Sequence, residues 1–226
     1  MSTYWKKTDL PGGAIYVITS KALDKPLEIF HYLTNMQSGP CFNVVKIFEE
    51  DPLGMYITPE QHAHWLGAIF PEWYKARERY GPIKPFYNYL RCLEGKGATI
   101  GCEDSGSCAY NWVYVGPKGN TSHCGRSGDY DLLSYGSIYD HSLEEIFTDE
   151  QRALLDKRNE VLAEDECKDC NLWRICHGGC PLDAFIEKGD FLHRHPNCVD
   201  KKILFKEYIE PVTGLKADFG IKPPVS

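Results

Sequence analysis

The sequence lacks any apolar run as long as the ~18–20 residues that a transmembrane helix needs. Lys6 and Lys7 near the N-terminus are not followed by an apolar segment, so we expect no secretory signal peptide. Basic residues are also few, because 25 lysines and arginines stand against 32 aspartates and glutamates. The resulting net charge of −7 disfavours binding to nucleic acid, which needs clustered cations. We therefore expect neither nucleic acid nor a membrane as a partner.

Internal repeats and low-complexity tracts are absent as well, which excludes a collagen-like chain. Hydrophobic residues make up 42% of the sequence and charged residues 25%, as in ordinary globular proteins. The 226 residues suffice for one large domain or two small ones with a buried core.

The N-terminal region alternates between strand and helix signals. Residues 14–18 and 42–48 are short apolar runs typical of buried strands. A helix is expected after each run, the first beginning at Pro26 and the second at a capping box that opens with Thr58. Pro71 should kink or split the second helix. This order indicates parallel pairing in an α/β layer, but two strands alone cannot close a barrel.

Beyond this region, glycine and cysteine become more frequent and turns replace long helices. Residues 109–115 alternate as a strand does, and residues 116–119 supply a turn. The pattern predicts a β-hairpin with Cys108 on one arm and Cys124 on the other, which would bring the two thiols close together.

Later helices should begin at capping boxes that open with Ser142 and Thr148, and at Pro181. The second of these helices should run to about Leu162, and Gly189 should end the last one. We divide the chain into an α/β region (1–91), a loop-rich α+β region (92–210) and a loosely held tail (211–226).

Cysteine is abundant, with ten residues, and four of them form the run Cys167, Cys170, Cys176 and Cys180. Thiols at this spacing converge on a metal or an iron–sulfur cluster more readily than they form structural disulfides. Eight cysteines lie from Cys102 to Cys198, which makes two sets of four. The other two are Cys41 and Cys92, which we expect to be buried core residues.

The segment from Cys176 to Pro181 reads C-x3-C-P. A bacterial ferredoxin run ends in the same way, and there the last cysteine ligates the other cluster. By the same geometry, Cys180 should point away from a site shared by the three cysteines before it. A zinc ribbon would more typically show two C-x2-C pairs, but two four-cysteine zinc sites remain an alternative.

The cysteine spacing resembles a known family. Cys108, Gly119 and Cys124, followed by the four-cysteine run and Cys198, are similar to the seven-cysteine SPASM domain of radical S-adenosylmethionine (SAM) peptide-modifying enzymes. Cys102 matches an eighth ligand of anaerobic sulfatase-maturating enzymes. The resemblance covers about residues 100–205. Residues 14–78 are similar, more weakly, to the last strands and helices of the radical SAM barrel, so the resemblance implies a partial α/β barrel followed by a SPASM domain.

The resemblance implies two auxiliary [4Fe-4S] clusters. The first set of ligands would be Cys102, Cys108, Cys124 and Cys180, and the second set would be Cys167, Cys170, Cys176 and Cys198.

Two departures from the family matter. The sequence contains no C-x3-C-x2-C, the three thiols that hold the SAM-cleaving cluster in the family. This chain alone should therefore be inactive in radical chemistry, and SAM is expected only if a missing N-terminal half is supplied. Gly125 stands where sulfatase maturases carry an aspartate that acts as a base, which disfavours formylglycine formation. Catalytic and SAM-binding residues stay unassigned.

Several other polar residues allow two interpretations. His177 could tune a cluster or carry a proton, although a partly exposed loop residue is the simpler interpretation. We interpret His62 and His64 as solvated. Asp129 and Asp131 could replace the missing base, or could lie in a solvated loop.

The same holds for a group of aromatic and basic residues. Tyr110, Trp112 and Tyr114 could form a peptide-binding wall, or could form the core of the hairpin. Lys168 and Arg174 could offset the negative charge of a thiolate-ligated cluster, or could lie on the surface.

These features favour an iron–sulfur protein that is the C-terminal portion of a radical SAM/SPASM peptide maturase. Its clusters would transfer electrons, an oxidoreductase role, or position a peptide or protein substrate. A partner subunit or the missing half would complete it. The alternatives are a non-enzymatic module that binds a peptide or partner, and a zinc protein. Thiolate-bound clusters need reducing conditions, so we expect a cytoplasmic protein.

Overall fold

The computed structural model describes residues 12–36, 38–46, 50–96 and 102–217. They form two compact units. The first unit takes in the described residues up to Thr99 together with Asn197–Ala217, and the second takes in the described residues of Ile100–Pro196. The sequence predicts residues 197–210 in the loop-rich region, whereas the structure groups them with the α/β region. Among the described residues, no helix has both the length and the apolar character to cross a membrane.

The first unit contains a parallel pair of strands, β1 (Gly12–Ile18) and β2 (Ser38–Val44), joined through η2 (Ser20–Ala22) and α1 (Pro26–Asn35). The predicted strand–helix–strand order and parallel pairing are confirmed. The second strand begins at Ser38, four residues before the prediction, because pairing with β1 keeps a Gly-Pro segment extended where local signals indicate a break. Residues 47 and 48, predicted as its end, lie outside the described residues.

The remaining helical elements of the first unit are α2 (Pro59–Lys75), α3 (Arg77–Tyr80), α4 (Phe86–Leu93), α11 (Val199–Ile203), the π-helical segment η4 (Leu204–Ile209) and α12 (Glu210–Thr213). α2 begins at the predicted capping box, in which the Thr58 amide donates to Gln61 Oε1 at 2.9 Å. Of the kink or split expected at Pro71, the split does not occur, because α2 is continuous through this residue. Its neighbours Phe70 and Trp73 are fully buried, and this packing stabilises the helix against the lost hydrogen bond.

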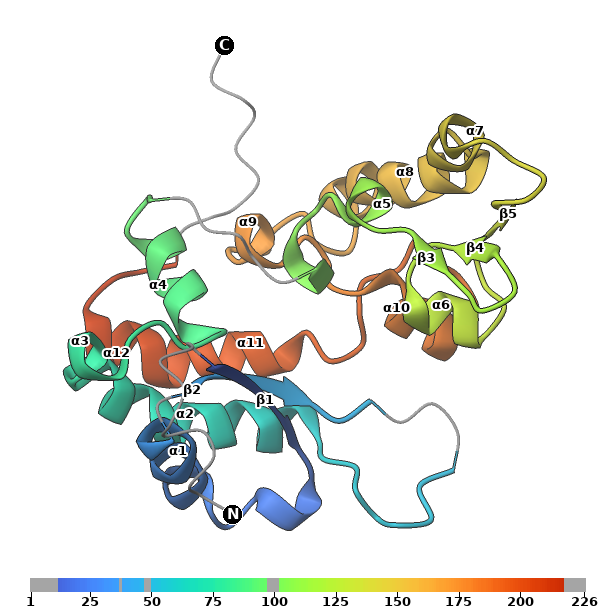
Figure 1. Ribbon diagram of the computed structural model, residues 1–226. Helices are drawn as coiled ribbons and strands as arrows, with labels where there is room; N and C mark the ends of the chain where they lie inside the picture. Colours follow the sequence, from blue (N-terminus) through green and yellow to red (C-terminus); the bar gives the residue numbers. More distant parts are fainter. Residues whose placement is uncertain (1–11, 37, 47–49, 97–101, 218–226) are drawn as a thin grey trace. The chain divides into compact units, whose positions relative to one another are not determined.

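Aromatic side chains fill the core between the strands and α2, which lies with α1 on the same side of β1 and β2 (Figure 1). The Trp65 ring stacks on Tyr16 at 6.2 Å between centroids and meets Phe42 edge-on at 5.2 Å. Its indole N–H donates to the carbonyl of Ala22 at 2.8 Å, which satisfies its polar atom inside the core. On the opposite face of the strands, Ile15 is 73% exposed.

Part of the predicted loose tail, residues 211–217, is folded. α12 extends to Thr213, and Ala217 is buried with its amide donating to Glu210 Oε1 at 3.0 Å. Residues 218–226, the rest of the predicted tail, lie outside the described residues.

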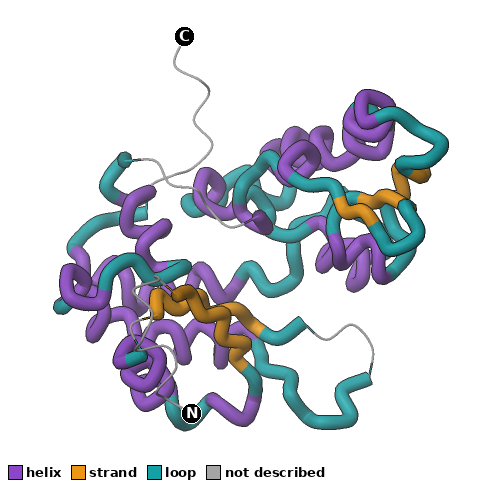
Figure 2. The backbone as a smooth tube through the Cα atoms, viewed as in Figure 1, coloured by secondary structure: helices purple, strands orange, loops and turns teal. Residues whose placement is uncertain are grey.

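The second unit combines short helices with a small antiparallel sheet (Figure 2). Its elements are η3 (Cys102–Asp104), α5 (Cys108–Asn111), β3 (Tyr114–Val115), β4 (Asn120–Ser122), α6 (Gly125–Asp129), β5 (Ser134–Ser137), α7 (Leu143–Phe147), α8 (Glu150–Glu164), α9 (Trp173–Cys176) and α10 (Pro181–Lys188). The strand order is β3-β4-β5.

The predicted hairpin is confirmed in a shorter form, as β3 and β4. Residues 108–111 form a helical turn instead of a strand, because the Asn111 amide group donates to the hydroxyls of Ser105 and Ser107 and closes the chain on itself. Cys108 therefore lies on a helix and not on a hairpin arm.

The sequence predicts three helix starts in this unit, and two of them are confirmed. The capping box at Ser142 is confirmed, and α10 begins at Pro181 as expected. The predicted box at Thr148 is wrong, since Asp149 is the N-cap of α8 and its side chain accepts from the Gln151 amide at 2.9 Å. Thr148 instead donates to the carbonyl of Glu144 and closes α7.

Candidate metal centre

The structure describes all ten cysteines, and none of them is in a disulfide bond. A structural disulfide framework is therefore not the reason for their number. Cys41 and Cys92 are half-buried, so the prediction that they are buried core residues is wrong. Both lie in the first unit, which also contains Cys198, while the other seven cysteines lie in the second unit.

Three members of the predicted first set lie at the beginnings of short helices. Cys108 is the first residue of α5, while Cys124 and Cys180 are the N-cap residues of α6 and α10. The Cys124 amide also donates to the hydroxyl of Ser127 at 2.8 Å. Helix N-termini carry partial positive charge and unpaired N–H groups, so these positions favour a thiolate.

The four thiols of the first set also interact electrostatically. Burial raises the pKa of the Cys108 thiol to about 12, and the neighbouring Cys180, Cys102 and Cys124 add to the increase. Cys180 is buried, Cys108 and Cys124 are half-buried, and Cys102 is exposed. Neighbouring thiolates repel one another, which a cationic iron–sulfide core bound between them would relieve. This donor set fits a four-thiolate cluster.

Within the part of the chain that the structure describes, no group of three or more His, Cys, Asp or Glu side chains could hold one metal ion. Four thiolates can bind either zinc or an iron–sulfur cluster, so two four-cysteine zinc sites stay an alternative.

A buried histidine supports the Cys108 sulfur. His123 Nε2 lies 3.1 Å from Cys108 Sγ, and His123 Nδ1 lies 3.2 Å from the hydroxyl of Tyr135. Burial, together with the charge of Arg152, lowers the pKa of His123 to about 4, so the ring is neutral near pH 7. A neutral ring in this position accepts from the tyrosine hydroxyl and donates to the sulfur, as partners of metal ligands commonly do.

A guanidinium group contacts the Cys180 sulfur. Arg126 Nη1 lies 3.3 Å from Cys180 Sγ, and Arg126 Nη2 bonds Asp183 Oδ1 at 2.5 Å. Burial alone would lower the pKa of Arg126, but Cys180 and Asp183 outweigh it and the pKa is raised. The positive charge of this arginine is thus shared between a thiol and a carboxylate.

The predicted second set has three members in the second unit: Cys167 and Cys170 lie in the turns between α8 and α9, and Cys176 is the last residue of α9. The Cys167 amide donates to the carbonyl of Leu162 at 2.8 Å, and the Cys170 amide donates to the carbonyl of Cys167 at 3.0 Å. Cys167 and Cys176 are buried. Cys198 is the N-cap residue of α11 in the first unit, and its place in the set stays a prediction.

The two glycines between Cys176 and Cys180 are required by the backbone. Gly178 has φ +79° and Gly179 has φ +71°, which is a region that L side chains rarely adopt. The Gly178 carbonyl accepts from the amide of His195 at 2.7 Å. These glycines let the chain turn between Cys176, which belongs to the predicted second set, and Cys180, which belongs to the predicted first set.

The basic residues around the thiols are not the ones that the sequence suggested. Lys168 and Arg174 are exposed, which agrees with their surface interpretation. The cations near the thiols of the second unit are the half-buried Arg126 and the buried Arg152 and Arg158, which sequence reasoning missed. Arg152 and Arg158 lie on the buried face of α8 together with Leu155 and Leu162. Arginines at the helical spacing of apolar residues were the sequence signal that could have identified these buried cations. Arg152 donates to the carbonyls of Ala109 and Ile146, and this holds α5 and α7 against α8.

The three histidines that the sequence singles out differ in how far they are buried. His177 is half-buried and its Nδ1 lies 2.7 Å from the carbonyl oxygen of Asp104. The solvated interpretation of His62 is wrong, because its side chain is 14% exposed and Nδ1 lies 3.0 Å from Asp200 Oδ2. His64 is exposed and lies 2.7 Å from the Tyr208 hydroxyl.

The remaining candidates are mostly on the surface. Asp129 and Asp131 are exposed, as the solvated-loop interpretation expects. Tyr110 and Trp112 are 51% and 52% exposed, so they are not the core of the hairpin. Tyr114 is half-buried.

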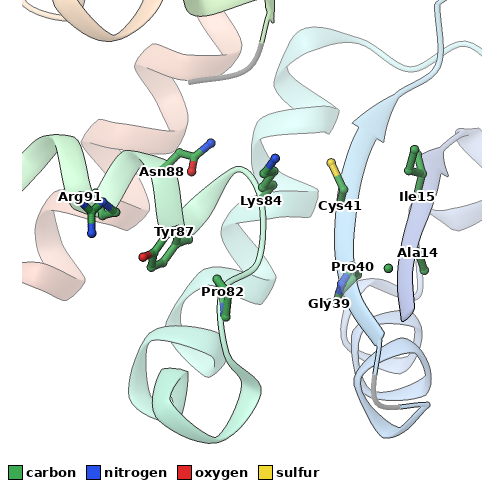
Figure 3. A pocket seen from close by; sticks show the side chains of 11 residues that line it. Ala14, Ile15, Gly39, Pro40, Cys41, Pro82, Lys84, Tyr87, Asn88 and Arg91 are labelled. Atoms are coloured by element: carbon green, nitrogen blue, oxygen red, sulfur yellow. The ribbon is translucent and has the colours of Figure 1, made fainter. Parts of the chain in front are cut away.

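The first unit contains a cavity of about 940 Å³ that sequence reasoning did not find (Figure 3). It lies between the beginnings of β1 and β2 and the α4 region, and Lys84 and Arg91 give it positive charge. Cys41 lines the cavity. Among the lining residues that the structure describes, there is none of the eight predicted cluster ligands. Burial raises the pKa of Cys41, which Lys84 partly offsets.

Comparison with known proteins agrees with the cysteine pattern. Residues 102–171 match the SPASM family, described as an iron–sulfur cluster-binding domain. The expected resemblance is confirmed. The cysteine-type anaerobic sulfatase-maturating enzyme of Clostridium perfringens is 24% identical over 220 residues, which is 92% of this chain and 56% of that protein. The serine-type enzyme of Bacteroides thetaiotaomicron is 24% identical over 148 residues, which is 59% of this chain and 32% of that protein.

Solved structures show the same fold. Native anSMEcpe with bound AdoMet and the Kp18Cys peptide matches with a TM-score of 0.74 and 20% identity, over 93% of this chain and 59% of that one. Native anSMEcpe with bound AdoMet matches with a TM-score of 0.70, 20% identity and coverage of 89% and 56%. The chain thus spans little more than half the length of these relatives.

Proposed function

We propose that this chain binds two auxiliary [4Fe-4S] clusters and supplies the cluster-binding portion of a radical SAM/SPASM peptide maturase. The observation that carries the proposal is the SPASM match over residues 102–171, within which three thiols of the first set interact. The first set would be Cys102, Cys108, Cys124 and Cys180, and the second would be Cys167, Cys170, Cys176 and Cys198.

The chain's own residues would bind and orient the clusters. Helix N-termini favour the thiolates of Cys124 and Cys180, and the His123 ring orients Cys108 through its bond to the sulfur. When bound, such clusters supply one-electron transfer or a rigid surface that positions a peptide. The first unit would be part of a radical SAM barrel, which a partner subunit or further chain completes.

The proposed substrate is a peptide or a protein, in reducing cytoplasm. A relative of the same fold binds a peptide, which supports this class of substrate. Gly125 stands where the sulfatase maturases carry an aspartate base, so we propose that formylglycine formation is not the reaction that this chain serves. The exposed Asp129 and Asp131 lie in the same segment of the chain.

Metal analysis tests the proposal against the zinc alternative. After anaerobic reconstitution, we expect about eight iron atoms and about eight sulfides per chain, with broad absorption in the visible range. A colourless protein with about two zinc ions and no sulfide would contradict the proposal and support two four-cysteine zinc sites.

A second experiment tests the dependence on a separate SAM-cleaving site. The sequence has no C-x3-C-x2-C, so the reconstituted chain mixed with SAM and dithionite should give no 5′-deoxyadenosine. Formation of 5′-deoxyadenosine by this chain alone would be inconsistent with the absence of that motif. A redox titration then separates electron transfer from a purely structural role, since a non-enzymatic binding module need not cycle its clusters.

A further inference from the structure

We propose that Arg158 is a single fixed positive charge shared by the two cluster sites, and that it raises the reduction potentials of both. The inference rests on the proposed function, because it needs two clusters. It assigns a role to a residue outside the cysteine pattern, on the buried face of α8.

The position of the Arg158 guanidinium is fixed by backbone carbonyls. The side chain is buried, and its residue is 4% exposed. Nη2 donates to the carbonyls of Gly178 and His193, both at 2.8 Å, and Nε also donates to His193 at 3.1 Å. Nη1 lies 3.4 Å from the carbonyl oxygen of His177. Because these acceptors are neutral, they hold the guanidinium without cancelling its charge.

Two of the carbonyls that Arg158 binds lie in the chain between a member of one predicted set and a member of the other. His177 and Gly178 lie between Cys176, a member of the second set, and Cys180, a member of the first. Arg158 also lines a small cavity together with Cys108, His177 and other residues of the second unit. A single side chain thus lies at the junction of the two sites.

The electrostatic partners of Arg158 agree with this position. Burial lowers the pKa of Arg158, and four thiols oppose the change: Cys180, Cys167, Cys176 and Cys108. Two of these thiols belong to the first predicted set and two belong to the second.

A buried charge acts more strongly than an exposed one, because the protein interior screens it less than water does. Reduction adds one negative charge to a cluster, so a nearby cation stabilises the reduced form and raises the potential. One guanidinium between two sites would also weaken their mutual repulsion. Arg126 differs, because it contacts Cys180 and is paired with Asp183.

The experiment compares four variants of the full chain, each reconstituted anaerobically and titrated with dithionite while the clusters are followed by electron paramagnetic resonance. Arg158→Gln should shift both midpoint potentials to more negative values. Arg158→Lys keeps the charge and should leave both near those of the unaltered chain. Arg126→Gln should shift only the first-set cluster, and Arg174→Gln, at an exposed position, should shift neither.

Several results would overturn the inference. One is an Arg158→Gln variant with full iron content and unchanged potentials, and another is a shift confined to one cluster. If Arg158→Gln does not retain its clusters, Arg158→Lys decides, and a fall in both of its potentials would show that the hydrogen bonds matter and the charge does not. Failure of the unaltered chain to bind two clusters would instead contradict the proposed function.

Discussion

Replacing Cys108 with alanine is expected to remove about half of the iron that the reconstituted chain binds. Cys108 is half-buried among three other thiols of its predicted set, so its loss leaves one corner of a cluster without a ligand. The second set contains none of these residues and should keep its cluster. Iron and sulfide analysis of the variant, with electron paramagnetic resonance after reduction, measures the effect.

Cys41→Ala is the matched control, because Cys41 is also half-buried but lies on β2 in the first unit. It should bind as much iron as the unaltered chain. Equal losses in the two variants would contradict the assignment of Cys108 as a ligand.

Gly178→Ala should destabilise the second unit and reduce the loading of both clusters. At φ +79° an alanine costs ~1–2 kcal/mol, and its Cβ would fall 2.3 Å from Leu162 Cδ1 in a buried contact. Overpacking of this kind costs a further ~1–3 kcal/mol. Because Gly178 lies between Cys176 and Cys180, the distortion would reach a ligand of each set. Thermal unfolding and iron content measure the two effects.

Gly189→Ala separates strain of the backbone from the close contact. Gly189 has φ +73° at the end of α10, and a Cβ there would meet no atom within 4 Å. This variant should lose only ~1–2 kcal/mol of stability and should keep its clusters. A Gly178→Ala variant no less stable than Gly189→Ala would show that the packing around Leu162 is looser than the structure indicates.

The elements that the sequence predicts well are those with strong local signals. The capping boxes at Thr58 and Ser142 and the start at Pro181 depend on contacts within one helical turn. The missed strand β5 (Ser134–Ser137) has a single large apolar residue, Tyr135, and forms because β4 offers it an edge. Such pairing depends on residues distant in the chain.

In the candidate site, too, some features could be predicted from the sequence and others could not. The resemblance groups Cys108 with Cys124 and Cys180, and the charges of both of these thiols act on Cys108. That Cys180 leaves the run in which it lies stays a prediction. The cations near these thiols could not be chosen from the sequence. Lys168 and Arg174 are closer to the cysteine run in the chain, but Arg158 reaches it across the fold from α8.

The account depends most on how the cysteines divide into two sets, and the iron content of paired variants tests this most directly. Cys180 follows Cys176 closely in the sequence but is predicted to share its cluster with Cys108. The double variant Cys108→Ala/Cys180→Ala should therefore keep about half of the iron, while Cys176→Ala/Cys180→Ala should keep almost none. The opposite order, with half of the iron retained only when Cys176 and Cys180 are both replaced, would contradict the division into two sets.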